Sequence, residues 1–152
     1  MGEVVVVGRH PDDRLARSPV LLRTSFAEGE LPAVRRRLEQ VARGCGLTPD
    51  EAYDWVIAVN ELMANAIRHG GGAGALRVWR DGDLYCEVGD RGTGFAAGPY
   101  LAPRARPMPS PHGGMGLWIA QRMTGEMWIE SGPSGTVVRI RTPLPAPERP
   151  FA

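Results

Sequence analysis

The clearest pattern of apolar and polar positions in the chain lies between residues 48 and 69. Apolar residues recur there at the three- and four-residue spacing of a buried helix face: Trp55, Val56, Val59, Leu62, Met63 and Ala66. Thr48 and Glu51, with Pro49 between them, form the pattern of a capping box at a helix start. The pattern therefore predicts a long helix that ends before the glycines at 70–72.

A second side of this helix is polar and includes Asp54, Glu61, Asn65 and Arg68. Residues four apart project from the same helix face, so Glu61 and Asn65 bring a carboxylate and a carboxamide together about one turn before the helix ends. This side either meets water, which is the ordinary arrangement for an amphipathic helix, or meets a ligand.

An earlier helix is predicted to begin near Pro32 and to end at about 44–46, where glycines follow. Its apolar face is formed by three residues at helical spacing, Val34, Leu38 and Val41. Its other face carries three consecutive arginines, Arg35, Arg36 and Arg37. That cluster is either a solvated helix surface or a docking patch for an acidic protein partner.

Short apolar and alternating runs predict the strands. Two precede the helices, at 4–7 and 20–26, and two hairpins follow, at 76–80 with 84–90 and at 127–131 with 136–141. Period-two alternation in the 84–90 strand places Asp90 on the same side as Val88, in an apolar layer. A carboxylate in that position requires a hydrogen-bonding partner, because an unpaired buried charge is costly.

Composition fits one globular domain and excludes several functions. The chain has 152 residues, 43% apolar and 23% charged, and a net charge of +1 with the signs interspersed, which argues against direct binding of nucleic acid. No apolar run near the start is long enough for a signal peptide or a membrane span, so we expect a cytoplasmic protein with no membrane contact. The two cysteines have neither metal-ligand nor disulfide spacing.

Glycine and proline mark a candidate ligand site in the second half of the chain. Residues 95–113 contain five of the 14 prolines and no periodic pattern, which indicates a long loop of the kind that is usually functional. Gly113 to Gly116 then precede a predicted helix at 117–124. Backbone N–H groups at such a helix start suit a phosphate, although most glycine-rich turns bind nothing.

Four motifs occur in order: Glu61 and Asn65 on a helix; Asp90, Gly92 and Gly94 after a strand; Gly114, Gly116 and Leu117 at a helix start; and Gly135 and Thr136 opening the last strand. In this order and spacing, residues 31–142 resemble the GHKL ATPase superfamily, which includes gyrase, MutL and the histidine kinases. The short length and the segments 58–61 and 65–70 most resemble the anti-sigma factor serine kinases of the RsbW and SpoIIAB type.

The resemblance implies the Bergerat ATP-binding fold, an α/β two-layer sandwich in which three helices cover one face of a mixed, mainly antiparallel sheet. The ATP-binding domain would occupy 19–142, and a tail at 143–152 with four prolines is expected to be frayed. Residues 1–18 have no counterpart in the short kinases, and would be an added edge strand, a partner-exchange element or a disordered arm.

The resemblance also implies ATP and Mg²⁺ as cofactors and gives roles to residues that would contact them. Asn65 would bind the metal, Glu61 would be the general base, and Asp90 would accept a hydrogen bond from the adenine amine. Gly92 and Gly94 would let the purine lie against the backbone. Thr136 would hold Asp90 or a bridging water molecule.

On the phosphate side, the resemblance implies binding by the glycine turn, whose residues are Gly114, Met115, Gly116 and Leu117, under a lid formed by 95–113. All 18 basic residues are arginine, so positive charge for phosphoryl transfer would come from Arg68, Arg104 and Arg106. His69 would either contact a phosphate or cap the helix end.

The implied function is a protein serine/threonine kinase that regulates transcription by partner switching. It would bind a sigma factor and phosphorylate an anti-anti-sigma protein of the STAS type, and homodimerisation through the first strands and the first helix is expected from the family. One alternative is a non-catalytic module that uses nucleotide only to shape a protein-binding surface. Another is a histidine-kinase-like catalytic domain, which is disfavoured because no helix with a phosphoacceptor histidine precedes the motifs.

Overall fold

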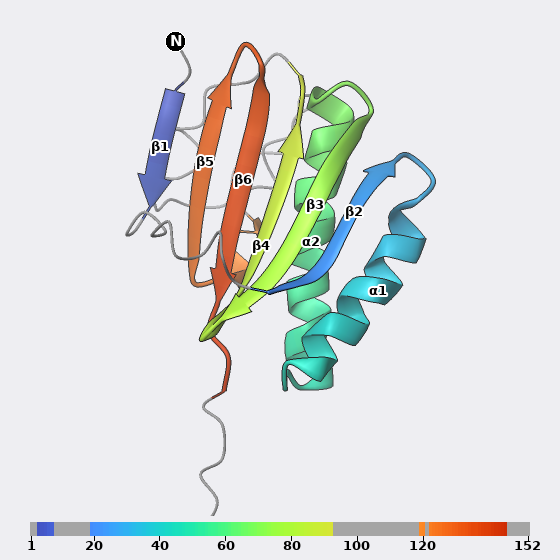
Figure 1. Cartoon of the computed structure of the whole chain (residues 1–152), viewed down its shortest axis with the longest axis vertical. Helices are drawn as coiled ribbons and strands as arrows, with labels where there is room; N and C mark the ends of the chain where they lie inside the picture. Colours follow the sequence, from blue (N-terminus) through green and yellow to red (C-terminus); the bar gives the residue numbers. More distant parts are fainter. Residues whose placement is uncertain (1–2, 8–18, 93–118, 121, 146–152) are drawn as a thin grey trace, which may run out of the picture.

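The structure is a computed structural model that describes residues 3–7, 19–92, 119–120 and 122–145. Its centre is a six-stranded sheet with the strand order β1-β5-β6-β4-β3-β2 (Figure 1). The strands are β1 (Glu3–Val7), β2 (Val20–Ala27), β3 (Ala73–Asp81), β4 (Asp83–Asp90), β5 (Glu126–Gly132) and β6 (Gly135–Thr142). Each lies within a few residues of its predicted range.

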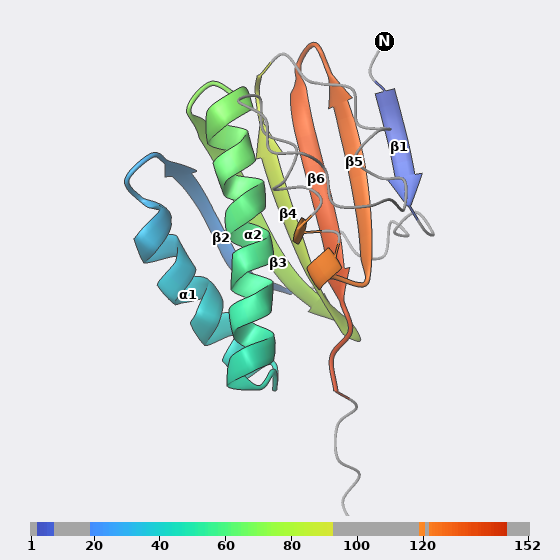
Figure 2. The ribbon, with the colours of Figure 1, turned by 180° about the vertical axis from the view of Figure 1, so that it is seen from behind.

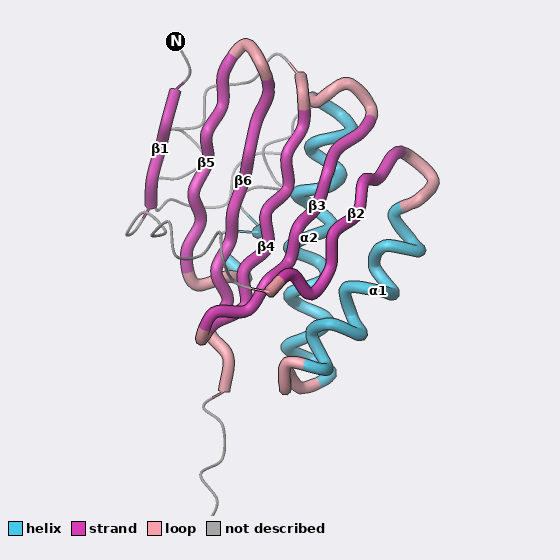
Figure 3. The backbone as a smooth tube through the Cα atoms, in the orientation of Figure 1, coloured by secondary structure: helices cyan, strands magenta, loops and turns pink. Residues whose placement is uncertain are grey.

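Two helices, α1 (Leu31–Gly44) and α2 (Pro49–His69), cover one face of the sheet, as Figure 2 shows. The predicted capping box of α2 is confirmed, because Glu51 N donates to Thr48 Oγ1 at 3.2 Å and Thr48 N donates to Glu51 Oε1 at 3.0 Å. The predicted helix at 117–124 lies partly outside the described residues, of which 119–120 and 122–123 are helical. The layering of helices on strands is clear in Figure 3.

The core lies between these two layers. The apolar stripe of α2 is buried as predicted, apart from the partly buried Val56, and faces the alternate apolar residues of the central strands β4 and β6. The largest buried side chains of this stripe are Trp55, Leu62 and Met63, each at most 2% exposed. Because α2 packs on the sheet along most of its length, the residues near its C-terminal end are held over the ends of β4 and β6.

The sheet differs from the predicted mixed arrangement, since every pairing of described strands is antiparallel. β4 and β5 do run in the same direction, because each pairs antiparallel with β6. They are not neighbours, however, because β6 is inserted between them. The α1–α2 pair likewise returns the chain so that β3 runs opposite to β2. The topology thus avoids any adjacent parallel pair among these strands.

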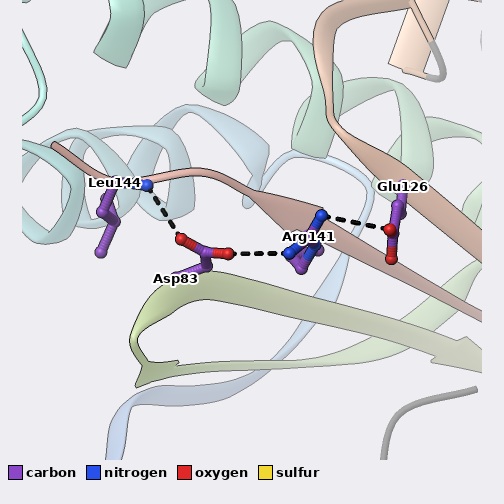
Figure 4. A network of polar contacts seen from close by, with 4 residues as sticks. All are labelled: Asp83, Glu126, Arg141 and Leu144. Carbon is purple, nitrogen blue, oxygen red and sulfur yellow. Dashed lines mark hydrogen bonds and ion pairs between the residues drawn. The ribbon is translucent and has the colours of Figure 1, made fainter. Parts of the chain in front are cut away.

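The first residues of the C-terminal tail are attached to the sheet (Figure 4). Leu144 N donates to Asp83 Oδ1 at 3.2 Å, and Asp83 Oδ2 pairs with Arg141 Nη1 at 2.9 Å. Arg141 Nη2 also pairs with Glu126 Oε1 at 3.1 Å, and Leu144 packs against the core. Within the segment 143–152, for which a frayed tail is expected, Leu144 is thus attached to the sheet by one backbone hydrogen bond and by apolar packing. Residues 146–152 lie outside the described part.

In the part of the chain that the structure describes, α2 included, none of the helices combines the length and the apolar character needed to cross a bilayer.

Candidate functional site

A polar row crosses three neighbouring strands at one end of the sheet. Asp90 at the end of β4 pairs with Thr136 of β6, which in turn pairs with Ser131 of β5. Directly opposite residues of antiparallel strands share a face, and the buried residues two positions away, Val88 and Val138, face the helices. The row therefore lies on the helix-covered face, where the sequence pattern places Asp90.

Asp90 has the hydrogen-bonding partners that its position requires. Its Oδ1 accepts a hydrogen bond from Gly92 N at 2.8 Å and one from Thr136 N at 3.3 Å. Among the described residues, the second carboxylate oxygen, Oδ2, has no such partner. Asp90 is thus held by two backbone donors through one oxygen, and its other oxygen can accept a hydrogen bond from a ligand.

Three glycines allow the backbone to approach this carboxylate closely. A Cβ atom on Gly70 would lie 2.3 Å from Asp90 Cγ, and one on Gly92 would lie 2.4 Å from the carbonyl oxygen of His69. A Cβ atom on Gly135 would lie 2.1 Å from the carbonyl oxygen of Asp90. Side chains at these positions would displace Asp90 or the end of α2, so packing requires the three glycines, and Gly135 also has a positive φ of 135°.

A small cavity joins the end of α2 to this row. Its volume is about 20 Å³, and its walls are formed by Leu62, Asn65, Ala66, His69, Val88, Asp90, Thr136 and Val138. The aliphatic residues give it apolar walls, while Asn65, Asp90 and Thr136 supply polar groups. This volume is sufficient for about one water molecule, so a larger ligand would enter from the open side and only its edge would reach between these groups.

A second, larger hollow of about 540 Å³ lies between α1 and α2. It is lined by Pro32, Arg35, Arg36, Glu39, Tyr53, Val56, Ile57, Asn60 and Glu61. Arg35 Nη1 donates to Asn60 Oδ1 at 2.9 Å across it, so one member of the predicted arginine cluster is engaged with α2. Arg36 and Arg37 are exposed.

The two polar residues of α2 that the sequence pattern pairs, Glu61 and Asn65, line different hollows. Asn65 borders the Asp90 cavity, and Glu61 borders the α1–α2 hollow one turn earlier. Both side chains are partly buried, whereas Arg68 and His69 are exposed at the end of α2. Glu61 therefore lines the groove between the helices, one turn before the residue that borders the Asp90 cavity.

Seven of the predicted site residues lie outside the described residues: Gly94, Arg104, Arg106, Gly114, Met115, Gly116 and Leu117. Conversely, Ser131 belongs to the site geometry but is not singled out by the sequence motifs, and the sequence marks Gly70 only as the end of the helix and of the 65–70 motif, not as a contact of Asp90. Ser131 follows Met127 and Ile129 at period-two spacing, which is the signal that places it on the buried face.

The two cysteines, Cys45 and Cys86, are buried thiols, and burial raises the pKa of each. Within the described residues no three histidine, cysteine or acidic side chains are grouped as a metal site. A divalent cation at Asn65 would therefore require most of its oxygen ligands from a bound anion and water, which suits Mg²⁺ in a nucleotide complex.

This combination of an antiparallel sheet, one helical layer and an aspartate beneath the end of the second helix defines a known class. The family model of the histidine kinase-like ATPase domain matches residues 24–142, and the chain belongs to that family.

Among solved structures, the chain is similar to the RsbU and RsbW domains of Rv1364c from Mycobacterium tuberculosis, with a TM-score of 0.56 and 21% sequence identity. The match covers 86% of this chain and 35% of that one, so the chain spans about a third of the length of its relative. At this identity the similarity shows the fold. No curated protein matches the chain.

Proposed function

We propose that the protein binds ATP and Mg²⁺ at the Asp90 cavity and acts as an anti-sigma serine kinase in a partner-switching system. The observation that carries the proposal is the convergence of Asn65, Asp90 and Thr136 on one cavity, with one oxygen of Asp90 unoccupied by the described residues. Family membership supports ATP as the ligand, and the similarity to a structure that contains an RsbW domain supports the regulatory role.

Recognition of adenine follows from the hydrogen-bonding capacity of Asp90. An ionised carboxylate only accepts, and Oδ1 is already engaged by two backbone N–H groups. Oδ2 would accept from the exocyclic amine of adenine, while the apolar walls formed by Leu62, Val88 and Val138 would contact the ring edge. A purine with an oxygen at the same position would place two acceptors against each other.

Residues at the end of α2 would bind the phosphate side. Asn65 offers a neutral oxygen ligand, and Mg²⁺ bound there would neutralise charge on the phosphate oxygens. Arg68 and His69 follow in the last turn and are exposed, so both can approach an anion. Arg104, Arg106 and the glycine turn at 114–117 remain proposed phosphate contacts outside the described residues.

Glu61 would accept the proton of a serine hydroxyl as that oxygen attacks the terminal phosphorus, with ADP as the leaving group. Its place in the α1–α2 hollow means that the hydroxyl would approach along this groove. The groove also contains Arg35 and Arg36, which would favour an acidic partner segment. A sigma factor and an anti-anti-sigma protein of the STAS type are the proposed partners.

A second candidate function is a nucleotide-dependent binding module without catalysis. It is favoured by the separation of Glu61 and Asn65 into different hollows, since a catalytic base must reach the hydroxyl that attacks the nucleotide. In that case nucleotide would only organise the protein-binding surface.

Incubation with labelled ATP, Mg²⁺ and the cognate serine-bearing partner separates these functions. Glu61→Gln should abolish transfer of label but leave ATP binding intact. Glu39→Gln, at another carboxylate of the same hollow, should transfer label at the wild-type rate. Equal labelling by the wild type and Glu61→Gln would reject Glu61 as the base, and ATP binding without any labelling of the partner would favour the non-catalytic module.

A further inference from the structure

Ser131 and Thr136 are the two polar side chains that lie fully in the core of the described residues, with 4% and 5% exposure. Their hydroxyl oxygens are 2.7 Å apart, and either one can be the donor. Thr136 N also donates to Asp90 Oδ1. Ser131 is therefore connected to the Asp90 carboxylate through Thr136 and lies one strand farther from it.

The direction of the Ser131–Thr136 hydrogen bond decides what Thr136 can offer a ligand. A threonine hydroxyl has a single hydrogen. If Thr136 donates it to Ser131, only lone pairs of Thr136 face the cavity. If Ser131 donates instead, the Thr136 hydrogen is available to an acceptor in the cavity that Thr136 and Asp90 line together.

On the basis of the proposed ATP site, we propose that Ser131 is a positioning residue for base recognition: it donates to Thr136 and thereby directs the Thr136 hydroxyl hydrogen toward the ring nitrogen beside the adenine amine. The contact is made directly or through one water molecule, for which the cavity has room. Ser131 itself does not touch the nucleotide.

The pattern of donors and acceptors supports this direction. Adenine presents a donor, the exocyclic amine, next to an acceptor, the ring nitrogen N1. Asp90 as acceptor and Thr136 as donor match that pair, whereas hypoxanthine and guanine present the reverse order. With the Ser131–Thr136 bond reversed, the site would present two adjacent acceptors, which complement neither kind of base.

The experiment measures the binding of ADP and of 1-deaza-ADP, in which a C–H group replaces N1, to four proteins. These are the wild type, Ser131→Ala, Ser131→Cys and the control Ser134→Ala, which changes an exposed serine in the turn between β5 and β6. Cysteine keeps the shape of the side chain with a slightly larger atom and is a weak donor, whereas alanine leaves a gap, so the two variants together separate the hydrogen bond from packing. Thermal melting of each free protein reports any general loss of folding.

We expect the wild type and Ser134→Ala to bind 1-deaza-ADP about five- to tenfold more weakly than ADP, the effect of losing about one hydrogen bond. Ser131→Ala and Ser131→Cys should bind ADP more weakly and should distinguish the two nucleotides less than the wild type does, because a Thr136 hydroxyl without its donor is free to turn its hydrogen away from the base. A merely structural role would instead lower affinity for both nucleotides equally and preserve the discrimination.

The inference would be overturned if both Ser131 variants distinguished ADP from 1-deaza-ADP as strongly as the wild type does. It would also be overturned if the wild type bound the two nucleotides equally. In both cases ADP still binds and the proposed ATP site stands. Absence of ADP binding by the folded wild type would remove the proposed site together with the inference.

Discussion

Gly70→Ala tests whether close packing around Asp90 is what requires glycine at the end of α2. The new Cβ atom would lie 2.3 Å from Ala66 O, 2.3 Å from Asp90 Cγ and 2.4 Å from Asp90 Cβ. These neighbours are a backbone atom and the base of a short side chain, so they cannot move without shifting α2 or β4. Gly70 has φ −111°, which any residue adopts, so the cost is steric and not conformational.

The neighbouring glycine provides a matched control. Gly71 has φ +85°, which an alanine tolerates poorly, but its Cβ would have no heavy atom within 4 Å. Gly71→Ala should cost about 1–2 kcal/mol from backbone strain. Gly70→Ala should cost about 3 kcal/mol, at the upper end of the usual cost of overpacking. If backbone conformation alone set the cost, Gly71→Ala would be the more destabilising of the two substitutions.

Urea denaturation followed by circular dichroism gives the free energy of unfolding of both variants and of the wild type. In addition, Gly70→Ala should weaken ADP binding on the order of tenfold, because it displaces a charged hydrogen-bonding group, while Gly71→Ala should not. If Gly70→Ala proved as stable as Gly71→Ala or more so, the packing described around Asp90 would be incorrect.

Three further predictions concern stability and reactivity. Arg141→Met should lower the free energy of unfolding by about 1 kcal/mol, because it removes two partly exposed ion pairs, and the loss should shrink in high salt; an unchanged urea midpoint would contradict it. Thr48→Ala should cost about 1 kcal/mol through loss of the α2 cap. Hydrogen bonds from Thr48 lower the pKa of Glu51. The stabilisation from Glu51 should therefore be present at neutral pH and disappear as the pH falls through the depressed pKa. Urea midpoints measured between pH 7 and 3 would reveal this loss. Cys86 should resist Ellman's reagent in the native protein at pH 8 and react on unfolding, since burial raises its thiol pKa; rapid native labelling at this residue would refute its burial.

Much of the fold follows from local sequence signals. The helix at 49–69, with its capping box, and the alternation that buries Val88 beside Asp90 depend on residues within a few positions of each other. Hairpin turns at 82 and 133–134 are equally local. Such patterns specify an element and its buried face, and they are sufficient to place Asp90 in the apolar layer with hydrogen-bonding partners.

The order of the strands and the fine geometry of the site depend on contacts between distant segments. Pairing of β1 with β5, and insertion of β6 between β4 and β5, are not encoded in any single periodic pattern. The i and i+4 rule places Glu61 and Asn65 on one side of α2, but α1 determines that they border different hollows. The close approach of Gly70 to Asp90 is likewise a tertiary contact.

The most direct test of the ATP site is calorimetric titration of ATP into the wild type and Asp90→Asn, with and without Mg²⁺. The amide oxygen of the substituted side chain can still accept both backbone hydrogen bonds, but its NH₂ group replaces the acceptor that adenine requires. Asn65→Ala is the companion variant for the metal, with Asn60→Ala in the other hollow as its control.

If the proposed site is correct, the wild type and Asn60→Ala bind ATP, and Mg²⁺ increases the affinity of both. Asn65→Ala loses this increase in affinity. Asp90→Asn shows no binding with or without Mg²⁺. Wild-type affinity in folded Asp90→Asn would contradict the account.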